Sequence, residues 1–370
     1  MADIAIRLTD VSKRFSGTAT DAVAGLSLEI PSGSIVALIG PSGCGKTTTL
    51  RMINRLIEPT SGRIEINNND VLSVPVTDLR RGIGYVIQQV GLFPHRTVAQ
   101  NIAMVPKVLG WEKARIADRV AELIELVGLD ASLTNRYPDE LSGGQQQRVG
   151  VARALAADPP VLLMDEPFGA VDPIVRCRLQ DQLLALQQKV HKTIVLVTHD
   201  IDEALKVADR VALFNLGATV EQFSTPDELL RAPRSEFVER FVGEDRGMKR
   251  LALKSVSQLP FDQGTVVDAR CAVPDAISVL DNAGADWLGV TSGGQFVGWL
   301  HRDDLIPGAE LGAGPLRRPA AQVTPSSTLR NALELIMTSA TAGAVIVDND
   351  RFGGVVTVEA IRKCLSSEDQ

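Results

Sequence analysis

Four continuous apolar runs, rich in β-branched residues, alternate with stretches of helical periodicity in the first two thirds of the chain. The apolar runs lie at 34–40, 82–88, 161–165 and 193–198. The helical patterns lie at 112–127, 146–157 and 173–190. Runs without polar alternation are typical of strands that are buried on both faces, as in a parallel sheet. We therefore predict an α/β fold around a mainly parallel sheet for residues 1–243.

The region between the second and third apolar runs has a different pattern. Residues 90–158 are rich in helical periodicity and poor in β-type runs, so we expect a helical subdomain that is inserted into the sheet domain. Further along, the stretch 243–254 begins with glycine and is locally basic. This composition predicts a linker at 244–258.

A pattern of turn, helix, strand, turn, strand and helix then occurs twice, at 273–305 and 324–365. In both copies an apolar strand, a glycine-containing turn and a second apolar strand precede the last helix. Two such units close one core when they stack. We expect an α+β domain at 259–370, built from repeats at about 259–308 and 317–366.

Composition and charge narrow the class of protein. The chain has 370 residues and a net charge of −7, which argues against a nucleic-acid binder that relies on phosphate contacts. Its four cysteines are widely spaced, so we expect a reducing compartment and neither a disulfide framework nor a zinc site. The first residues lack the apolar core of a signal peptide, and no apolar run approaches the roughly 18 residues of a membrane-spanning helix. Any role at a membrane would then require a partner protein.

The stretch GPSGCGKTT, residues 40–48, follows one apolar run and precedes a helical pattern at 46–57. It fits the pattern G-x-x-x-x-G-K-[ST] in the strand–loop–helix context that this pattern requires. Its glycines allow backbone N–H groups to surround phosphate oxygens, and the positive end of the helix points to the same place. Lys46 supplies a cation for the β- and γ-phosphates, and the Thr47 hydroxyl is a ligand for Mg²⁺. The predicted ATP-binding residues of this loop are Gly40, Pro41, Ser42, Gly43, Cys44, Gly45, Lys46, Thr47 and Thr48.

The stretch VLLMDEP, residues 161–167, places two carboxylates at the end of an apolar run. Charges at the end of a buried strand require compensation. We predict that Asp165 holds Mg²⁺ through water, and that Glu166 is the general base for a water in line with the γ-phosphate. The alternative use of either carboxylate is to cap the helix at 173–190, but Pro167 and the following FGAV argue against it.

A second phosphate cradle lies far along the chain from the first. In LSGGQ, residues 141–145, two glycines leave backbone N–H groups unhindered at the start of a helix. Two cradles on one phosphate would duplicate each other. The economical arrangement places the second cradle on the ATP of another copy of the chain, so that two ATP molecules lie between two copies.

These motifs, in this order, resemble those of ABC transporter ATPase subunits over about residues 4–243. LSGGQ looks like the signature motif of that family. The resemblance implies that the signature binds the γ-phosphate that the partner copy holds. The residues concerned are Ser142, Gly143, Gly144 and Gln145.

The same resemblance assigns four further residues. Phe15 would stack on adenine, and Asp172 would contribute to the nucleotide site from the D-loop. Gln88 would touch Mg²⁺ and the attacking water, although Gln89 beside it leaves this assignment open by one position. His199 would contact the γ-phosphate, so that the implied catalytic residues are Gln88, Glu166 and His199.

The two C-terminal repeats resemble tandem CBS domains, and an ABC ATPase followed by such a pair resembles the ATPases of glycine betaine/proline/choline importers. The resemblance implies a subunit that hydrolyses ATP with Mg²⁺ and powers import of an osmoprotectant through a membrane permease. The implied assembly is a homodimer of ATPase subunits at the cytoplasmic face of the plasma membrane. An extracytoplasmic binding protein would deliver the solute, and no nucleic acid is implied as a partner.

The repeats depart from the CBS pattern G-x-x-T-x-x-D. The first keeps Asp304 but has His301 in place of threonine, and the second keeps Thr357 but has Ala360 in place of aspartate. Binding of a regulatory nucleotide, sensing of ionic strength and simple pairing of two chains therefore all stay open for this region.

Three other functions are alternatives to osmoprotectant import. An importer ATPase for a different small solute has the same motifs. A soluble ABC protein of repair or translation usually has two cassettes or a long coiled-coil insertion, and this chain has neither. A regulatory adenylate sensor with an inactive cassette conflicts with the intact Lys46, Glu166 and His199.

Overall fold

The computed structural model describes residues 3–87, 91–169, 171–259, 265–306, 311, 316–317, 321–339, 343–349 and 351–366. The chain divides into two compact units, Met1–Glu244 and Asp245–Gln370. None of the helices in the described ranges has the length and apolar character needed to cross a bilayer.

The first unit is built on a six-stranded sheet of order β10-β9-β3-β8-β7-β6. Its strands are β3 (Ile35–Ile39), β6 (Ile83–Val86), β7 (Val161–Asp165), β8 (Thr193–Val197), β9 (Arg210–Asn215) and β10 (Thr219–Ser224). The first five are parallel, and β10 joins β9 in antiparallel pairing. Every residue of β3, β7 and β8 is buried, which confirms the predicted parallel sheet with both faces covered.

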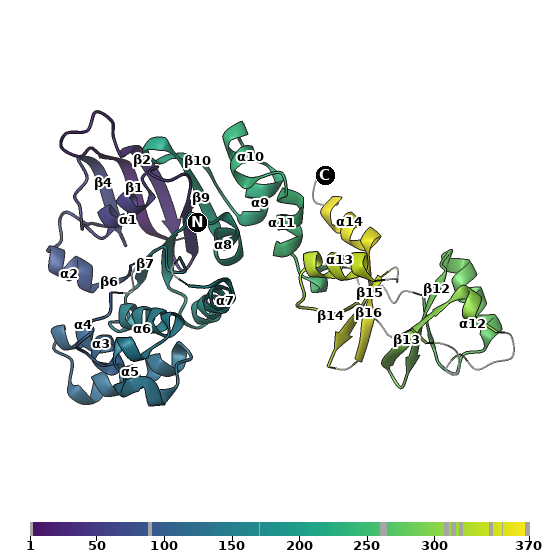
Figure 1. Ribbon diagram of the computed structural model, residues 1–370. Coiled ribbons are helices and arrows are strands. Elements are labelled where there is room, and N and C mark those ends of the chain that lie inside the picture. The colour runs from purple at the N-terminus through teal and green to yellow at the C-terminus, as the bar shows by residue number, and fades with distance from the viewer. Residues whose placement is uncertain are drawn as a thin grey trace. The chain divides into compact units, whose positions relative to one another are not determined.

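A smaller antiparallel sheet of order β2-β1-β4-β5 completes this part of the unit (Figure 1). Its strands are β1 (Ile4–Lys13), β2 (Val23–Pro31), β4 (Ser61–Ile66) and β5 (Asn69–Asp70). The helix α1 (Lys46–Ile53) follows β3, and its Leu50 packs in one core with Ile6 of β1 and Leu38 of β3. The loop between β3 and α1 is therefore anchored where the two sheets share a core.

Several further helices belong to the first unit. They are α2 (Val76–Arg81), α7 (Pro173–Val190), α8 (Ile201–Val207), α9 (Pro226–Arg231) and α10 (Glu236–Val242), with the 3₁₀ turn η3 (Leu216–Ala218).

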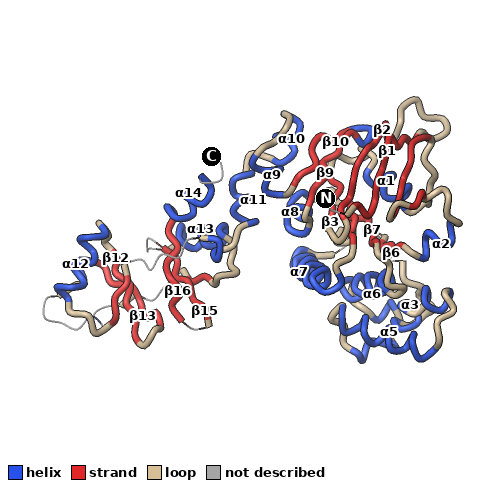
Figure 2. Tube along the Cα trace, turned by 180° about the vertical axis from the view of Figure 1, so that it is seen from behind, coloured by secondary structure: helices blue, strands red, loops and turns tan. Residues whose placement is uncertain are grey.

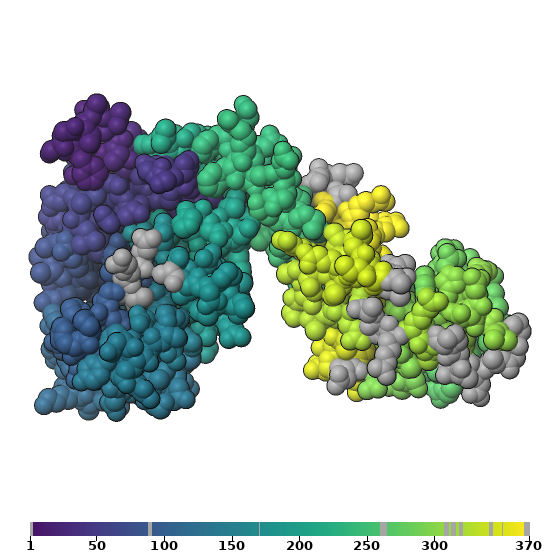
Figure 3. Space-filling view, viewed as in Figure 1, coloured from purple at the N-terminus to yellow at the C-terminus, as the bar shows by residue number. Residues whose placement is uncertain are grey.

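Residues 91–158 form the helical subdomain and contain no strand. Its elements are α3 (Val98–Ile102), α4 (Met104–Val108), α5 (Lys113–Leu126), η1 (Ala131–Asn135), η2 (Pro138–Glu140) and α6 (Gly143–Leu155). Figure 2 shows α3, α5 and α6 gathered to one side of the strands. In the space-filling view, the N-terminal residues (purple) and this subdomain (blue to teal) lie at opposite ends of the unit (Figure 3).

The second unit contains two copies of a strand–helix–strand–strand arrangement. The first copy comprises β11 (Val266–Asp268), α12 (Val273–Ala283), β12 (Trp287–Ser292), β13 (Gln295–His301) and η5 (Arg302–Asp304). The second comprises β14 (Gln322–Val323), α13 (Leu329–Thr338), β15 (Gly343–Asp348), β16 (Arg351–Thr357) and α14 (Val358–Ser366). In both copies the first two strands are parallel and the last two are antiparallel, with one register shift close to the hairpin turn.

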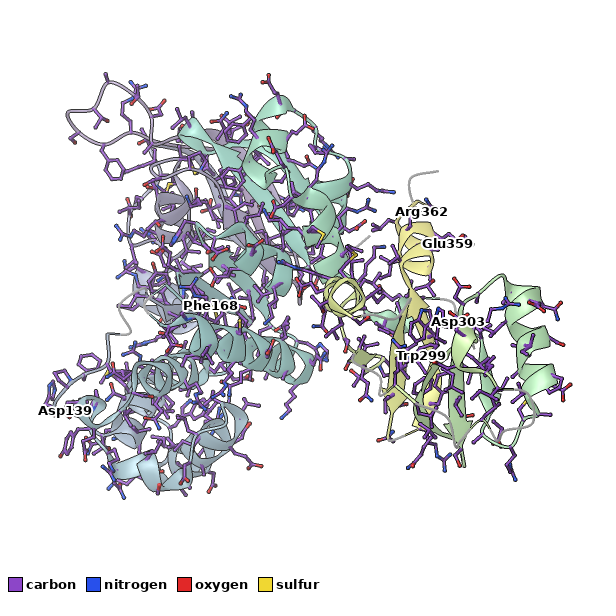
Figure 4. All side chains as sticks on the ribbon, turned by 45° about the vertical axis from the view of Figure 1, so that its right-hand side comes forward. Asp139, Phe168, Trp299, Asp303, Glu359 and Arg362 are labelled. Atoms are coloured by element: carbon purple, nitrogen blue, oxygen red, sulfur yellow. The ribbon has the colours of Figure 1, made fainter. Side chains whose placement is uncertain are left out.

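Aromatic side chains at equivalent positions of the two copies pack against each other. Phe296 and Phe352 stand at matching places in their hairpins, and their rings stack with centroids 5.6 Å apart. Trp299 of β13 is buried with Val345 and Val355, and Figure 4 shows it where the strands of the two copies meet. The two halves therefore close a shared core, as stacked repeats do.

The linker expected at 244–258 is instead a folded part of the second unit. The helix α11 (Arg246–Leu253) and the turn η4 (Val256–Gln258) occupy these residues, and α11 packs against α13. Leu251 and Val256 are buried in the same core as Ile336. The basic composition of this stretch indicated a linker although α11 has an apolar side. Long basic side chains are compatible with such a helix, because their methylene stems cover apolar surface.

Gly84 of β6 leaves no space for a side chain. A Cβ there would lie 2.5 Å from the carbonyl oxygen of Ala154 in α6 and would also meet the side chain of Leu162. We expect Gly84→Ala to lower the free energy of unfolding of the first unit by about 1–3 kcal/mol, because α6 must shift. Thermal unfolding followed by circular dichroism measures this change.

Gly82→Ala is the matched control for Gly84→Ala. A Cβ at Gly82 would meet no atom closer than 3.5 Å, so the unfolding free energy should change by less than about 0.5 kcal/mol. Equal unfolding midpoints for the two variants would contradict the close packing of β6 on α6.

Candidate nucleotide-binding site

The loop at residues 40–45 joins β3 to α1 and is shaped by its glycines. Gly40, Gly43 and Gly45 have φ angles of 144°, 78° and 107°, a region that disfavours residues with a Cβ. A Cβ at Gly45 would lie 2.6 Å from the carbonyl oxygen of Ala22, and one at Gly40 would collide with the Phe214 carbonyl. The backbone here requires glycine, and it leaves the N-terminus of α1 without a side-chain cap.

Lys46 folds back over this loop. Its Nζ donates hydrogen bonds to the carbonyl oxygens of Gly40 (2.7 Å) and Pro41 (2.9 Å), and the residue is only 7% exposed. The sulfur of Cys44 lies 3.6 Å from the same Nζ, inside the loop. The cation is thus already held within the phosphate-binding loop, where an anion would find it.

Two of the predicted metal ligands lie together. The Thr47 hydroxyl donates a hydrogen bond to Asp165 Oδ1 over 3.0 Å. Burial raises the pKa of the Asp165 carboxyl above its ordinary value, and the hydrogen bond from Thr47 acts in the opposite direction. A hydroxyl and a buried carboxylate are hard oxygen donors, which fit Mg²⁺, and a cation would compensate the buried charge. The third predicted ligand, Gln88, lies outside the described residues, as does Gln89.

Glu166 and His199 face each other across the ends of two strands. The Nδ1 of His199 lies 3.3 Å from Glu166 Oε1, and the two side chains are 67% and 23% exposed, respectively. The backbone N–H of Glu166 donates to the Val197 carbonyl (2.9 Å), although Glu166 has a positive φ of 47°. A left-handed backbone at a non-glycine residue is uncommon and is often found at functional sites. The predicted general base is therefore partly shielded from solvent and paired with the predicted histidine.

The signature residues cap their own helix. Ser142 is the N-cap of α6, where its Oγ accepts from the Gln145 N–H (3.3 Å) while Gln145 Oε1 accepts from the Ser142 N–H (2.8 Å). This capping box explains why α6 begins at the glycine pair of the signature, as expected, although the apolar periodicity begins only at 146. A Cβ on Gly143 would meet no atom within 4 Å, whereas one on Gly144 would lie 2.7 Å from Val175. Gly143 thus leaves the helix start open to an approaching molecule.

Asp172 and Phe15 take the remaining predicted positions. Asp172 is the N-cap of α7, and its Oδ1 accepts from the N–H groups of Ile174 (3.1 Å) and Val175 (3.0 Å). The cap of α7 is therefore Asp172, and not Asp165 or Glu166. Phe15 is exposed beside Lys13, whose Nζ is 5.4 Å from the ring centroid.

The structure brings the predicted residues together in part. The loop at 40–48, Asp165, Glu166 and His199 meet at the carboxyl ends of β3, β7 and β8, where ligands of parallel sheets bind. Within the described residues, no hydrogen bond or ion pair links the signature at 141–145 to the loop at 40–48.

Two residues beside His199 were not predicted from the sequence. Arg176 of α7 pairs with Asp200 (NH1 to Oδ2, 3.3 Å), and the buried Glu203 of α8 accepts a hydrogen bond from Thr198. For Glu203 the sequence did offer a signal. Asp200 and Glu203 are three residues apart, which is the spacing of a capping box at a helix start.

Comparison with known proteins identifies the family. The model of the ABC transporter family matches residues 23–169. The osmoprotectant import ATP-binding protein OsmV of Salmonella typhimurium is 46% identical, over 98% of this chain and 96% of its own. The choline transport ATP-binding protein OpuBA of Bacillus subtilis is 43% identical, over 95% and 94% of the two chains.

A solved structure shares the fold of the first unit. The dimeric bacterial ABC transporter cassette MJ0796 is 34% identical with a TM-score of 0.54, and the match covers 60% of this chain and 98% of that one. Two observations indicate the same family. One is the P-loop ATPase fold with its helical subdomain, and the other is the sequence similarity along nearly the whole chain. This chain therefore belongs to the ABC transporter family and is one of its ATP-binding proteins, an ATPase.

Proposed function

We propose that this protein is the ATP-hydrolysing subunit of an importer for glycine betaine, choline, proline or a similar osmoprotectant. The observation that carries the proposal is the extent of the similarity to OsmV, which covers 98% of this chain and so includes the second unit. An ABC cassette alone is common to importers of many solutes. The second unit is the part of the chain that favours this group of importers over the others.

The hydrolytic mechanism follows from the site geometry. The glycine loop and the N-terminus of α1 bind the phosphates of ATP, and Lys46 turns from the carbonyls of Gly40 and Pro41 toward the phosphate oxygens. Thr47 and Asp165 would hold Mg²⁺, which would supply charge neutralisation at the phosphate oxygens when bound. Glu166 accepts a proton from the attacking water, and His199 beside it contacts the γ-phosphate.

Two copies of the chain complete two such sites. Gly143 leaves the N-terminus of α6 unobstructed, and the signature has no bond to the phosphate loop of its own chain within the described residues. The helix start of one copy then closes over the γ-phosphate of the other copy. The dimeric arrangement of the related cassette MJ0796 supports this pairing.

The permease contact is assigned to a pocket of about 990 Å³ on the helical subdomain. Its walls are mainly apolar, with Ile116 and Val120 of α5 among them, and they include Lys107 and Lys113. Exposed apolar surface that is rimmed by polar residues is a common feature of protein contact sites. A cytoplasmic segment of the permease with apolar residues and a carboxylate for the lysines fits this lining. We propose that the protein acts at the cytoplasmic face of the plasma membrane, with an extracytoplasmic binding protein as an indirect partner.

The second unit is proposed to be a tandem CBS domain that regulates activity. Asp304, the one aspartate kept from the CBS pattern, already lies near Arg317 (Oδ2 to NH2, 3.8 Å), and Arg317 stacks on Trp287. In the second repeat the Thr357 hydroxyl accepts from the N–H of Ala360 (3.2 Å). A regulatory nucleotide at this unit and the pairing of chains through it are further parts of the proposal.

Glu166→Gln tests the assignment of the general base. The variant keeps the size of the side chain but cannot accept a proton, so we expect ATP binding to persist while kcat falls by about 10²–10⁴-fold. Steady-state phosphate release and binding of a fluorescent ATP analogue measure the two properties. Glu29→Gln, an exposed glutamate that pairs with Arg7, is the control and should leave kcat unchanged. Turnover near the wild-type rate in Glu166→Gln would reject the assignment.

Uptake of radiolabelled solutes tests the transported class. We expect cells that lack other osmoprotectant uptake to accumulate glycine betaine, choline or proline when they express this chain with its permease and binding protein. Cells with the Glu166→Gln chain should not accumulate them, because import requires hydrolysis. Uptake of none of these solutes, together with uptake of an unrelated small solute, would show that the cassette serves another importer.

A further inference from the structure

The loop that carries His199 is held by its two neighbours in the sequence. This loop, residues 198–200, joins β8 to α8. Thr198 is 1% exposed, whereas the side chain of His199 is 67% exposed. The position of the histidine therefore depends on how firmly Thr198 and Asp200 are held.

Glu203 occupies the position of a capping-box glutamate, three residues after the N-cap Asp200. In an ordinary box this side chain accepts from the N–H of the N-cap residue, as Gln145 does for Ser142. At α8 the Asp200 N–H donates instead to Thr198 Oγ1 (3.0 Å), and the Thr198 hydroxyl donates to Glu203 Oε2. The threonine hydroxyl is thus inserted between the helix cap and the glutamate.

We propose that Glu203 is a positioning residue for hydrolysis: its bond to the Thr198 hydroxyl fixes the backbone on both sides of His199. One side is Thr198 itself, and the other is Asp200, whose N–H is bound by the same hydroxyl. The inference rests on the proposed contact of His199 with the γ-phosphate.

The environment of Glu203 favours a functional role over a stabilising one. The residue is 6% exposed, and within the described structure its Oε1 has no hydrogen-bond partner. Burial raises the pKa of this carboxyl, which means that the ionised form is disfavoured there. A half-satisfied buried carboxylate costs stability, and such costs concentrate at functional sites.

Other contacts tie the same loop to different elements and stay in place without Glu203. The Thr198 N–H donates to the Leu38 carbonyl of β3 (3.2 Å), next to the phosphate loop. Asp200 pairs with Arg176 of α7 (3.3 Å) and accepts from the Asp202 N–H (2.9 Å). Removal of the Glu203 carboxylate should therefore loosen the loop without unfolding the unit, because only the hydroxyl of Thr198 loses its acceptor.

Steady-state ATP hydrolysis by the full chain tests this proposal with three variants. Glu203→Ala should lower kcat by about 10- to 100-fold, because a displaced catalytic group loses alignment. The KM for ATP should change by less than about twofold, because the phosphate loop at 40–48 supplies most of the proposed contacts to ATP and stays intact. Glu203→Gln keeps an oxygen acceptor for Thr198 and should stay within about threefold of the wild-type kcat. Asp202→Ala removes an exposed carboxylate from the same helix turn and should leave kcat unchanged. This control distinguishes loss of the contact to Thr198 from loss of a negative charge near the helix N-terminus.

A double-mutant cycle with Thr198→Val tests the link itself. Thr198→Val should lower kcat at least as much as Glu203→Ala does, because it removes the acceptor of the Asp200 N–H as well as the bond to Glu203. The double variant should be no slower than Thr198→Val alone, since the bond to Glu203 is already lost in that variant. Additive losses would overturn the proposal, and so would a Glu203→Gln variant as slow as Glu203→Ala. If Glu203→Ala does not fold, the other two variants decide the question. Slow turnover by Thr198→Val together with normal turnover by Glu203→Gln then supports the proposal. Unchanged turnover by Thr198→Val overturns it.

His199→Ala separates this inference from the proposed function. If His199→Ala keeps the wild-type kcat, the assignment of His199 fails and the role of Glu203 fails with it. If His199→Ala loses turnover while Glu203→Ala keeps it, the positioning role of Glu203 alone is overturned.

Discussion

Three fully buried parallel strands that end side by side hold the reacting groups of this protein together. β3, β8 and β7 are neighbours in the sheet, and two backbone hydrogen bonds continue beyond their paired residues. One runs from the Thr198 N–H to the Leu38 carbonyl (3.2 Å) and the other from the Glu166 N–H to the Val197 carbonyl (2.9 Å). Buried backbone groups rarely stay unpaired, so these loops cannot move apart without losing bonds. The phosphate loop, the general base and the histidine are fixed to one another for this reason.

The sheet does not hold the signature, and this division gives the protein its proposed mode of action. Ser142 and Gln145 satisfy each other at the start of α6, and Gly143 beside them stays open. One copy thus offers the phosphate loop, the metal ligands and the base, while another copy offers an uncovered helix N-terminus. Hydrolysis then depends on the approach of two copies. The helical subdomain carries both the signature and the pocket assigned to the permease, so one part of the chain can link closure on ATP to transport.

Structural features that depend on a strong local sequence pattern could be predicted from the sequence. The buried strands and the phosphate loop follow from continuous apolar runs and from glycines at fixed spacing, which depend on short stretches of chain. The helix α11 was missed because basic residues surround Leu251, and only the fold shows that Leu251 is buried in the second unit. The bond between Thr198 and Glu203 was missed because two helix-start geometries fit the same spacing. Side-chain contacts of this kind depend on rotamers and burial, and spacing alone does not determine them.

Complementation between two inactive chains tests the shared site most directly. Lys46→Ala disables the phosphate loop and keeps the signature, whereas Gly143→Asp places a carboxylate at the open helix start and keeps the phosphate loop. Each variant alone should hydrolyse almost no ATP. A mixture of the two should regain hydrolysis, because each mixed pair contains one site with an intact loop and an intact signature. Full activity of Gly143→Asp alone, or no recovery in a mixture that forms pairs, would contradict a site that two copies share.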